Sequence, residues 1–251
     1  RTPALRGRRG RRRTAHSRTG LRPERWSAPR DFLPRCPCSA LLFIGLGLVA
    51  AQFHLTLDVH KFRLVHRDMV DPLARFQQEG VLLAEKTGEA LRNVMFDICF
   101  TSPLSRAKQT AEYVLGKRDV PIIPDKRIQE IDFGVLEGDQ VRDADGNYID
   151  PQIETFFRDP VNFKRPEKGE DIFDVIARTK DFWDEKTSDP TLADKTILVA
   201  SHGCAVRALL QNVDPDPKNF WRGSVPPNCC INLVEVKNGM TTLLEEDRVY
   251  A

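Results

Sequence analysis

The chain has 251 residues, which is enough to form one large hydrophobic core or two modest ones. Its apolar content of 41% and its charged content of 29% are ordinary for a soluble globular protein, which excludes a wholly disordered or fibrous chain. The net charge of +2 conceals an asymmetry, because residues 1–35 carry a charge of +10 and the remaining 216 residues sum to −8.

The first 60 residues differ in composition from the rest. Residues 1–35 contain twelve arginines, no lysine and no hydrophobic periodicity, so we expect a disordered segment or one foreign to the domain. A nucleic-acid or anionic-membrane arm is the alternative, and we expect neither partner. Residues 39–53 form an apolar run of 15, whereas a transmembrane helix needs about 20. Export or anchoring through this run is a minority interpretation.

The six cysteines show neither a disulfide framework nor the paired spacing of a cysteine zinc site. Cys99 and the Cys229-Cys230 pair lie in apolar runs, where thiols usually act as small buried hydrophobic groups. Free thiols suit a reducing compartment, and the expected location is therefore cytoplasmic.

From residue 61 on, predicted strands and helices alternate. Short apolar runs bounded by turn residues predict strands, and apolar spacings of three and four residues predict helices. The predicted strands are residues 61–65, 96–100, 120–123, 197–200, 231–236 and 240–244. The predicted helices are residues 80–93, 104–115, 170–187 and one opened by Gly203.

This alternation predicts an α/β fold over residues 61–251, with a mostly parallel sheet covered on both faces by helices. In such folds ligands bind at the edge where the strands end at their carboxyl side. Three segments that follow predicted strands are therefore the candidates for a site.

The first candidate segment is Ser201-His202-Gly203, between a buried strand and the helix that Gly203 opens. A helix N-terminus presents free N–H groups and a partial positive charge, so it can bind a phosphate beside His202. The alternative is a loop histidine that caps this helix.

The other two segments supply a cation and acids. In Ser102–Thr110, Ser102-Pro103 is a plausible N-cap, and Arg106 falls in the first turn, where the helix dipole disfavours a cation unless an anion binds there. In Arg127–Gly138, Glu130 is bracketed by apolar residues, and burial of such a carboxyl would let it carry a proton near neutral pH. Taken singly, a surface arginine and a solvated turn remain open alternatives.

Together, Ser102–Thr110, Glu130–Gly134 with Glu137-Gly138, and Ser201–Gly203 resemble the motifs of the histidine phosphatase superfamily, in the family's order. That superfamily includes cofactor-dependent phosphoglycerate mutases and many broad phosphatases. The resemblance covers roughly residue 80 to the C-terminus. It implies a three-layer α/β domain with an inserted, mostly helical cap, which we expect at residues 139–185.

The resemblance also implies the roles of the site residues. Arg106 would clamp the phosphate, Glu130 would protonate the leaving oxygen, and His202 would donate to a non-bridging oxygen. Gly203 would contribute the helix N-terminus to phosphate binding. No cofactor and no metal are implied, the expected partner is a small phosphorylated metabolite, and the oligomeric state stays open.

The chain departs from the family at the first strand. The family's nucleophile is the histidine of an R-H-G motif that ends this strand, whereas this chain has His66-Arg67-Asp68. A shift of one residue moves a side chain to the opposite face of a strand, so Arg67 would point where the nucleophile should be. His66 is the candidate nucleophile and Arg67 a candidate phosphate ligand, and little turnover is expected.

Three hypotheses follow. The first is a phosphomonoester hydrolase that acts through a phosphohistidine, with a phosphoglycerate mutase-type phosphotransferase as a less favoured variant. The second is a non-catalytic phosphate-binding or scaffold protein with a degenerate pocket. The third is an active family member whose first 60–79 residues are altered by a sequencing or gene-calling fault.

Overall fold

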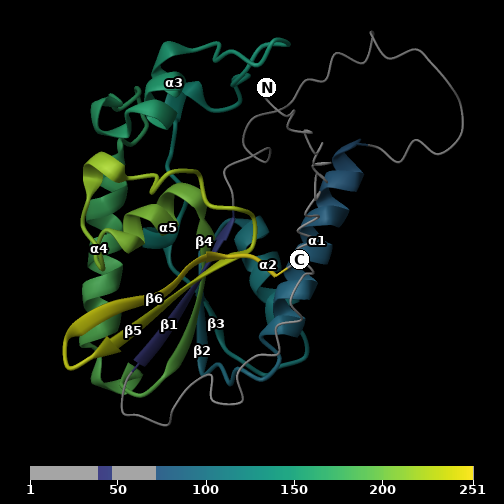
Figure 1. The fold of residues 1–251 in the computed structure, drawn as a ribbon, viewed down its shortest axis with the longest axis vertical. Coiled ribbons are helices and arrows are strands. Elements are labelled where there is room, and N and C mark those ends of the chain that lie inside the picture. Colours follow the sequence, from purple (N-terminus) through teal and green to yellow (C-terminus); the bar gives the residue numbers. More distant parts are fainter. Residues whose placement is uncertain (1–38, 47–71, 251) are drawn as a thin grey trace, which may run out of the picture. The chain divides into compact units, whose positions relative to one another are not determined.

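The computed structural model describes residues 39–46 and 72–250, and Figure 1 shows how their elements are arranged. The strands are β1 (Ser39–Leu46), β2 (Ile98–Thr101), β3 (Ile122–Pro124), β4 (Thr196–His202), β5 (Cys230–Lys237) and β6 (Met240–Arg248). The α-helices are α1 (Pro72–Ala90), α2 (Ser105–Leu115), α3 (Pro151–Arg158), α4 (Ile172–Ser188) and α5 (Gly203–Leu210). Short 3₁₀ helices span Lys126–Ile128, Gly134–Leu136, Pro160–Asn162, Pro190–Leu192 and Pro217–Asn219.

The six strands form one sheet in the order β3-β2-β4-β1-β5-β6. The pairs β3–β2, β2–β4 and β1–β4 are parallel, and β5 and β6 add an antiparallel hairpin at one side. The α/β fold with a mostly parallel sheet is therefore confirmed. Because the parallel strands point the same way, their carboxyl ends meet at one edge, where ligands bind in such folds.

The centre of the sheet is buried on both faces. In β4 every residue after Thr196 is buried, as expected for a parallel strand covered by helices on both sides. Helices α1 and α2 pack together on one side of the sheet, and α4 packs with α5 on the other (Figure 1). Phe182 and Trp183 of α4 join Val199 of β4 in one hydrophobic cluster.

The strand beside β4 is formed by a segment that the sequence did not predict to be a strand. The structure places Ser39–Leu46 there, in register from Ala40 opposite Thr196 to Leu46 opposite His202. Eight apolar or small residues suit a strand that has partners on both sides. The predicted first strand, residues 61–65, lies outside the described residues. The division at residue 60 and the limits of the cap, residues 139–185, stay predictions.

Two further expectations have structural outcomes. The helix after β2 begins at Ser105 with Leu104 as its N-cap residue, and no side chain caps it. The prediction of Ser102 as the N-cap residue is therefore wrong: its hydroxyl accepts from the N–H of Leu104 at 3.3 Å, ahead of the helix, and contacts His202. In the described part of the chain, no helix combines the length and the apolar character that crossing a membrane requires. The expected cytoplasmic location stays a prediction.

Candidate active site

Two neighbouring strands deliver polar residues to one edge of the sheet. β2 pairs with β4 as far as Thr101 opposite Ala200, so Ser102 and His202 follow at the carboxyl ends. The N–H group of Ser102 still donates to the carbonyl of Ala200, at 2.9 Å. Both Ser102 and His202 are buried, and this edge is the core of the candidate site.

His202 lies between an arginine and a serine. The Nε–H of Arg106 donates to Nδ1 of His202 at 3.1 Å, and Nε2 of His202 lies 2.7 Å from Oγ of Ser102. A guanidinium has only donors, so Nδ1 accepts and the proton of the neutral ring is on Nε2. Burial, together with the charges of Arg106 and Arg178, holds the pKa of His202 well below its usual value. The ring is therefore neutral at pH 7. His202 stands at the N-cap position of α5, but its side chain makes no capping hydrogen bond, which removes the capping alternative.

Arg106 is the second residue of α2, in its first turn as the sequence predicted. Burial lowers the pKa of Arg106, while the carboxyl groups of Glu130 and Glu137 act in the opposite direction. The cation thus stands where the helix dipole alone would disfavour it, with two acids in its vicinity. A guanidinium in this position can grip an anion with two parallel hydrogen bonds.

Glu130 is buried, with 3% of its surface exposed, in the loop between two 3₁₀ helices. Its carboxyl accepts hydrogen bonds from the N–H groups of Ile131 at 3.0 Å, Ala205 at 3.3 Å and Cys204 at 3.3 Å. Desolvation outweighs these hydrogen bonds and raises the pKa of Glu130 to about 7. A carboxyl with that pKa can both give and take a proton near neutral pH.

The N-terminus of α5 is used differently from the expectation. Gly203 opens the helix and is buried, but the next two N–H groups, of Cys204 and Ala205, point to the Glu130 carboxyl. The helix N-terminus thus binds an anion, as the physics of its free N–H groups predicts. In this structure that anion is the protein's own carboxylate.

The predicted residues His66 and Arg67 lie outside the described residues, so their positions stay predictions. The strand that ends opposite His202 is β1, and its sequence from Ser39 to Leu46 contains no histidine. The described site therefore brings together Arg106, Glu130 and His202, three of the residues that the sequence singled out.

Three further residues belong to this neighbourhood. Ser102 contacts the His202 ring, and Glu137 accepts from the N–H of Phe133 at 2.9 Å and has a pKa raised by burial. Arg178 of α4 donates to the carbonyl of Glu130 at 3.1 Å. Ser102 and Glu137 both lie in the sequence motifs, but those motifs predicted no role for Glu137 in the site. No spacing pointed to Arg178, because its partners are mostly backbone carbonyls.

Chemically, the arrangement offers a cation for an oxyanion, a neutral imidazole and a carboxyl that can exchange a proton. These are the parts of a site for phosphoryl transfer, in which positioning and charge stabilisation do most of the work. Among the residues that the structure describes, no group of three or more His, Cys, Asp or Glu side chains could hold a metal ion.

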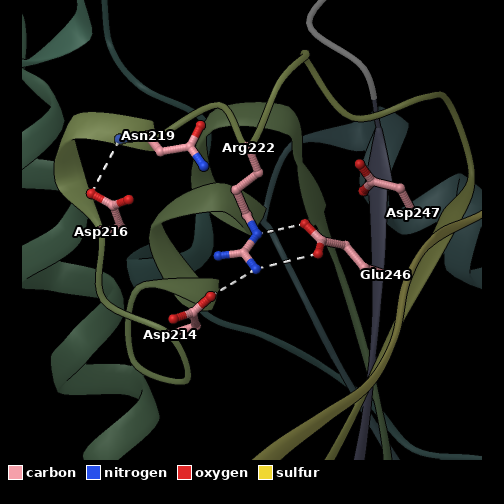
Figure 2. A pocket seen from close by; sticks show the side chains of 6 residues that line it. All are labelled: Asp214, Asp216, Asn219, Arg222, Glu246 and Asp247. Atoms are coloured by element: carbon pink, nitrogen blue, oxygen red, sulfur yellow. Dashed lines mark hydrogen bonds and ion pairs between the residues drawn. The ribbon is translucent and has the colours of Figure 1, made fainter.

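A separate, acidic cavity of about 450 Å³ lies beyond the C-terminal end of α5 (Figure 2). Arg222 bridges the acids there, binding Glu246 at 2.5 and 3.2 Å and Asp214 at 3.0 Å. None of the predicted site residues that the structure describes lines it, so we assign it no part in the chemistry. The lining residues are Asp214, Asp216, Asn219, Arg222, Glu246 and Asp247.

Comparison with known proteins gives a family match. The sequence profile described as histidine phosphatase superfamily (branch 1) matches residues 74–247. A curated relative, the 2,3-bisphosphoglycerate-dependent phosphoglycerate mutase of Methylobacterium sp. (strain 4-46), is 33% identical over 140 residues. That match covers 54% of this chain and 66% of the relative. The enzyme of the same name from Mesorhizobium japonicum is 33% identical, over 55% of this chain and 68% of that relative.

Solved structures show the same fold. Bacillus stearothermophilus YhfR superposes with a TM-score of 0.64 at 22% identity, covering 84% of this chain and 98% of that chain. A mycobacterial glucosyl-3-phosphoglycerate phosphatase superposes with a TM-score of 0.60 at 19% identity, covering 85% of this chain and 100% of that chain. At these identities the likeness establishes the fold alone.

Proposed function

Because the chain belongs to the histidine phosphatase superfamily, branch 1, we propose that it is a phosphomonoester hydrolase that works through a phosphohistidine intermediate. The observation that carries the proposal is the arrangement of the half-buried Arg106 with the buried His202 and Glu130 at the carboxyl edge of the sheet. This arrangement joins a phosphate clamp to a carboxyl whose pKa is raised to about 7.

In the proposed reaction, an imidazole nitrogen attacks phosphorus in line with the leaving oxygen, and the bond from phosphorus to that oxygen breaks. Arg106 and His202 stabilise the non-bridging oxygens, and Gly203 contributes its N–H group. Glu130 gives its proton to the leaving oxygen, so that an alcohol departs. Water then attacks the phosphohistidine, the Glu130 carboxylate takes a proton from that water, the phosphorus–nitrogen bond breaks, and phosphate is released.

His66 is the proposed nucleophile, and Arg67 is proposed to contact the same phosphoryl group. Both assignments come from the sequence. The hydrolase is preferred over a mutase because no residue of the described site argues for retention of the phosphorylated intermediate. The curated relatives above are named as mutases and one solved relative as a phosphatase, so the family accommodates both outcomes. The proposed substrate class is a small phosphorylated metabolite.

A second candidate, a non-catalytic phosphate-binding protein, is favoured by one observation. The strand that ends opposite His202 is Ser39–Leu46, and it brings no histidine to the site. If no other imidazole reaches the phosphorus, the clamp would bind phosphate without transferring it. Loss of a nucleophile typically lowers the rate by roughly 10⁴- to 10⁶-fold.

Turnover of p-nitrophenyl phosphate distinguishes the two candidates. The hydrolase proposal expects weak turnover that disappears in His66→Ala and increases in the triple variant His66→Arg, Arg67→His, Asp68→Gly. Vanadate binding should weaken in Arg106→Ala and stay unchanged in the control Arg92→Ala, an exposed arginine paired with Glu89. No turnover in any variant, with vanadate binding that depends on Arg106, would favour the binding protein. Vanadate binding that is unchanged in Arg106→Ala would reject both candidates.

A further inference from the structure

Arg178 of α4 uses every hydrogen-bond donor that a guanidinium has. Its Nη1 donates to the carbonyls of Arg127 at 2.8 Å and Gln129 at 2.7 Å, and its Nη2 donates to the carbonyl of Glu130 at 3.1 Å. Its Nε and Nη2 also bind the two carboxylate oxygens of Glu170, at 2.8 and 2.9 Å. A guanidinium has five N–H donors in one plane, and these five contacts match them.

Glu170 extends the same network to the other side of the loop that carries Glu130. Its Oε2 accepts from the N–H of Asp132 at 3.0 Å, and its own N–H donates to the carbonyl of Asp132 at 2.7 Å. The backbone of Glu130 is therefore held on one side by Arg178 and, two residues later, by Glu170. The side chains of this pair are mostly buried, with 19% and 25% of their surface exposed.

The two chain segments also approach too closely for side chains at two glycines. A Cβ on Gly134 would lie 2.2 Å from the carbonyl oxygen of Glu167, and one on Gly169 would lie 2.8 Å from that of Asp132. This close approach lets the main chain of the Glu130 loop pair with that of residues 167–170. The loop thus rests on a second segment of chain, which precedes α4.

We infer that Arg178, together with Glu170, is a positioning residue for the proposed general acid: it fixes the Glu130 loop against the N-terminus of α5. The inference rests on the proposed function, because only that function makes Glu130 a general acid. A rigid loop keeps the Glu130 carboxyl in reach of the N–H groups of Cys204 and Ala205 and away from water. General-acid catalysis depends on such placement within fractions of an ångström.

The charged and titratable groups near Glu130 come from several elements. Arg106 from α2 and Arg178 from α4 are cations, Glu137 and Glu170 are acids, and His202 and the Cys204 thiol complete the set. Arg178→Lys keeps the cation of α4 in this set but replaces five planar donors by three on a flexible stem. A change in Glu130 in this variant therefore reports loss of the fork and not loss of charge.

A matched control exists at another place in the fold. Arg118 also gathers main-chain carbonyls with its guanidinium, but it joins the ends of α1 and α2 and contacts no residue of the site. Its acceptors are the carbonyl oxygens of Leu91, Val94, Val114 and Leu115. Arg118→Lys removes the same kind of fork and should affect stability alone.

The first measurement is the pKa of Glu130 in the full chain, from ¹³C-carboxyl NMR with the signal assigned by its loss in Glu130→Gln. We expect Arg178→Lys to lower this pKa by about one unit, because a loosened loop admits water and removes the desolvation that raises it. Glu170→Gln, which keeps the side-chain shape, should lower it too, but this variant also removes a negative charge near Glu130, so Arg178→Lys is the variant that decides. Arg118→Lys should leave it unchanged.

The second measurement compares two leaving groups. An alkyl phosphate needs a proton on its leaving oxygen, whereas p-nitrophenolate leaves without one. Arg178→Lys should therefore lower kcat roughly tenfold more for the alkyl ester than for p-nitrophenyl phosphate. Circular dichroism at the assay temperature establishes that each variant is folded.

An unchanged Glu130 pKa in Arg178→Lys would overturn the inference. An equal shift in Arg118→Lys would do the same, because it would mark a general loss of stability. If the native chain turns over neither ester, the proposed function fails, while the NMR comparison still decides whether Arg178 positions Glu130.

Discussion

Two buried side chains of the site, Glu130 and His202, have pKa values displaced in opposite directions. Desolvation is the first cause for both, because it disfavours the charged form of each group. Glu130 therefore keeps its proton up to about pH 7, whereas the His202 ring stays neutral. The same burial thus prepares one group to give a proton and the other to stay uncharged until an anion arrives.

The raised pKa of Glu130 predicts a pH-dependent stability. Its folded pKa of about 7 exceeds the ordinary 4.5, so the unfolded chain loses this proton first as the pH rises. The contribution to stability is full below about pH 4.5 and is lost as the pH rises through 7. Relative to Glu130→Gln, the native chain should lose about 2 to 3 kcal/mol of unfolding free energy between pH 5 and pH 8.

Urea denaturation of both proteins at the two pH values measures this difference. The fixed cost of placing an amide against the N–H groups of Cys204 and Ala205 is the same at both pH values, so it cancels when the two differences are compared. A difference between native chain and variant that does not change with pH would mean that Glu130 titrates normally.

The contact between Arg106 and His202 predicts proton uptake on anion binding. In the free protein, Nδ1 of His202 accepts from the Arg106 Nε–H, which keeps the ring neutral. When an oxyanion draws the guanidinium to itself, Nδ1 is released beside a negative charge, and the pKa of His202 should rise. We expect uptake of about one proton per bound tungstate, a dianion near neutral pH.

Isothermal titration calorimetry at pH 6.5, in buffers of different ionisation enthalpy, measures this uptake. In Arg106→Ala, the proton uptake should be lost together with most of the affinity for tungstate. If the observed enthalpy of tungstate binding is the same in all buffers, no proton is taken up and His202 stays neutral in the complex.

At the scale of elements, the sequence was most informative where one physical signal dominated. Residues 197–200 are a pure apolar run followed by polar residues and Gly203, and the structure has β4 ending at His202 and α5 starting at Gly203. The helix of Arg106 was predicted, but its cap was not. Ser102 has the composition of a cap, and only the paired strand β4 shows that its hydroxyl faces His202.

The first strand shows the limit of such reasoning. Residues 39–46 are apolar or small, but their run was assigned to a segment outside the domain, and the first strand was predicted at residues 61–65, just before His66-Arg67. What places β1 is its pairing with β4 and β5, which lie more than 150 residues away along the chain. Contacts at that separation leave no local pattern in the sequence. For the same reason, the sequence predicted no role for Arg178, whose carbonyl acceptors lie about 50 residues away.

A pair of proline variants tests the placement of β1. β1 has hydrogen-bonded neighbours on both sides, so a proline at Leu42, opposite Leu198 and Leu233, must remove a ladder hydrogen bond. We expect Leu42→Pro to lower the unfolding free energy by about 3 kcal/mol or more. Leu64→Pro is the matched variant in the segment that the sequence favoured.

Urea denaturation followed by circular dichroism compares the two variants. Unfolding by Leu64→Pro while Leu42→Pro stays native would contradict β1 as described. That result would also place His66 at the end of the strand beside β4, and it would strengthen the hydrolase over the binding protein.

At the scale of the whole described domain, one hydrophobic cluster joins the predicted cap to the site. Phe156 of α3 is fully buried, and its ring centroid lies 5.0 Å from that of Phe133 and 5.1 Å from that of Trp221. The same cluster contains Cys204 and Ala205, whose N–H groups hold Glu130. The helix α3 and the start of α5 therefore pack into one hydrophobic core.

This shared core predicts that the cap and the sheet unfold together. Phe156→Ala should lower the unfolding free energy by about 3 to 5 kcal/mol, because it leaves a cavity among Phe133, Phe163 and Trp221. Phe156→Leu, which fills most of that volume, should cost less. In both variants, tryptophan fluorescence and far-ultraviolet circular dichroism should report one coincident transition. A fluorescence transition at lower urea than the loss of secondary structure would instead mean that α3 and Trp221 melt separately. The cap would then be an independent unit that cannot hold α5 and Glu130 in place.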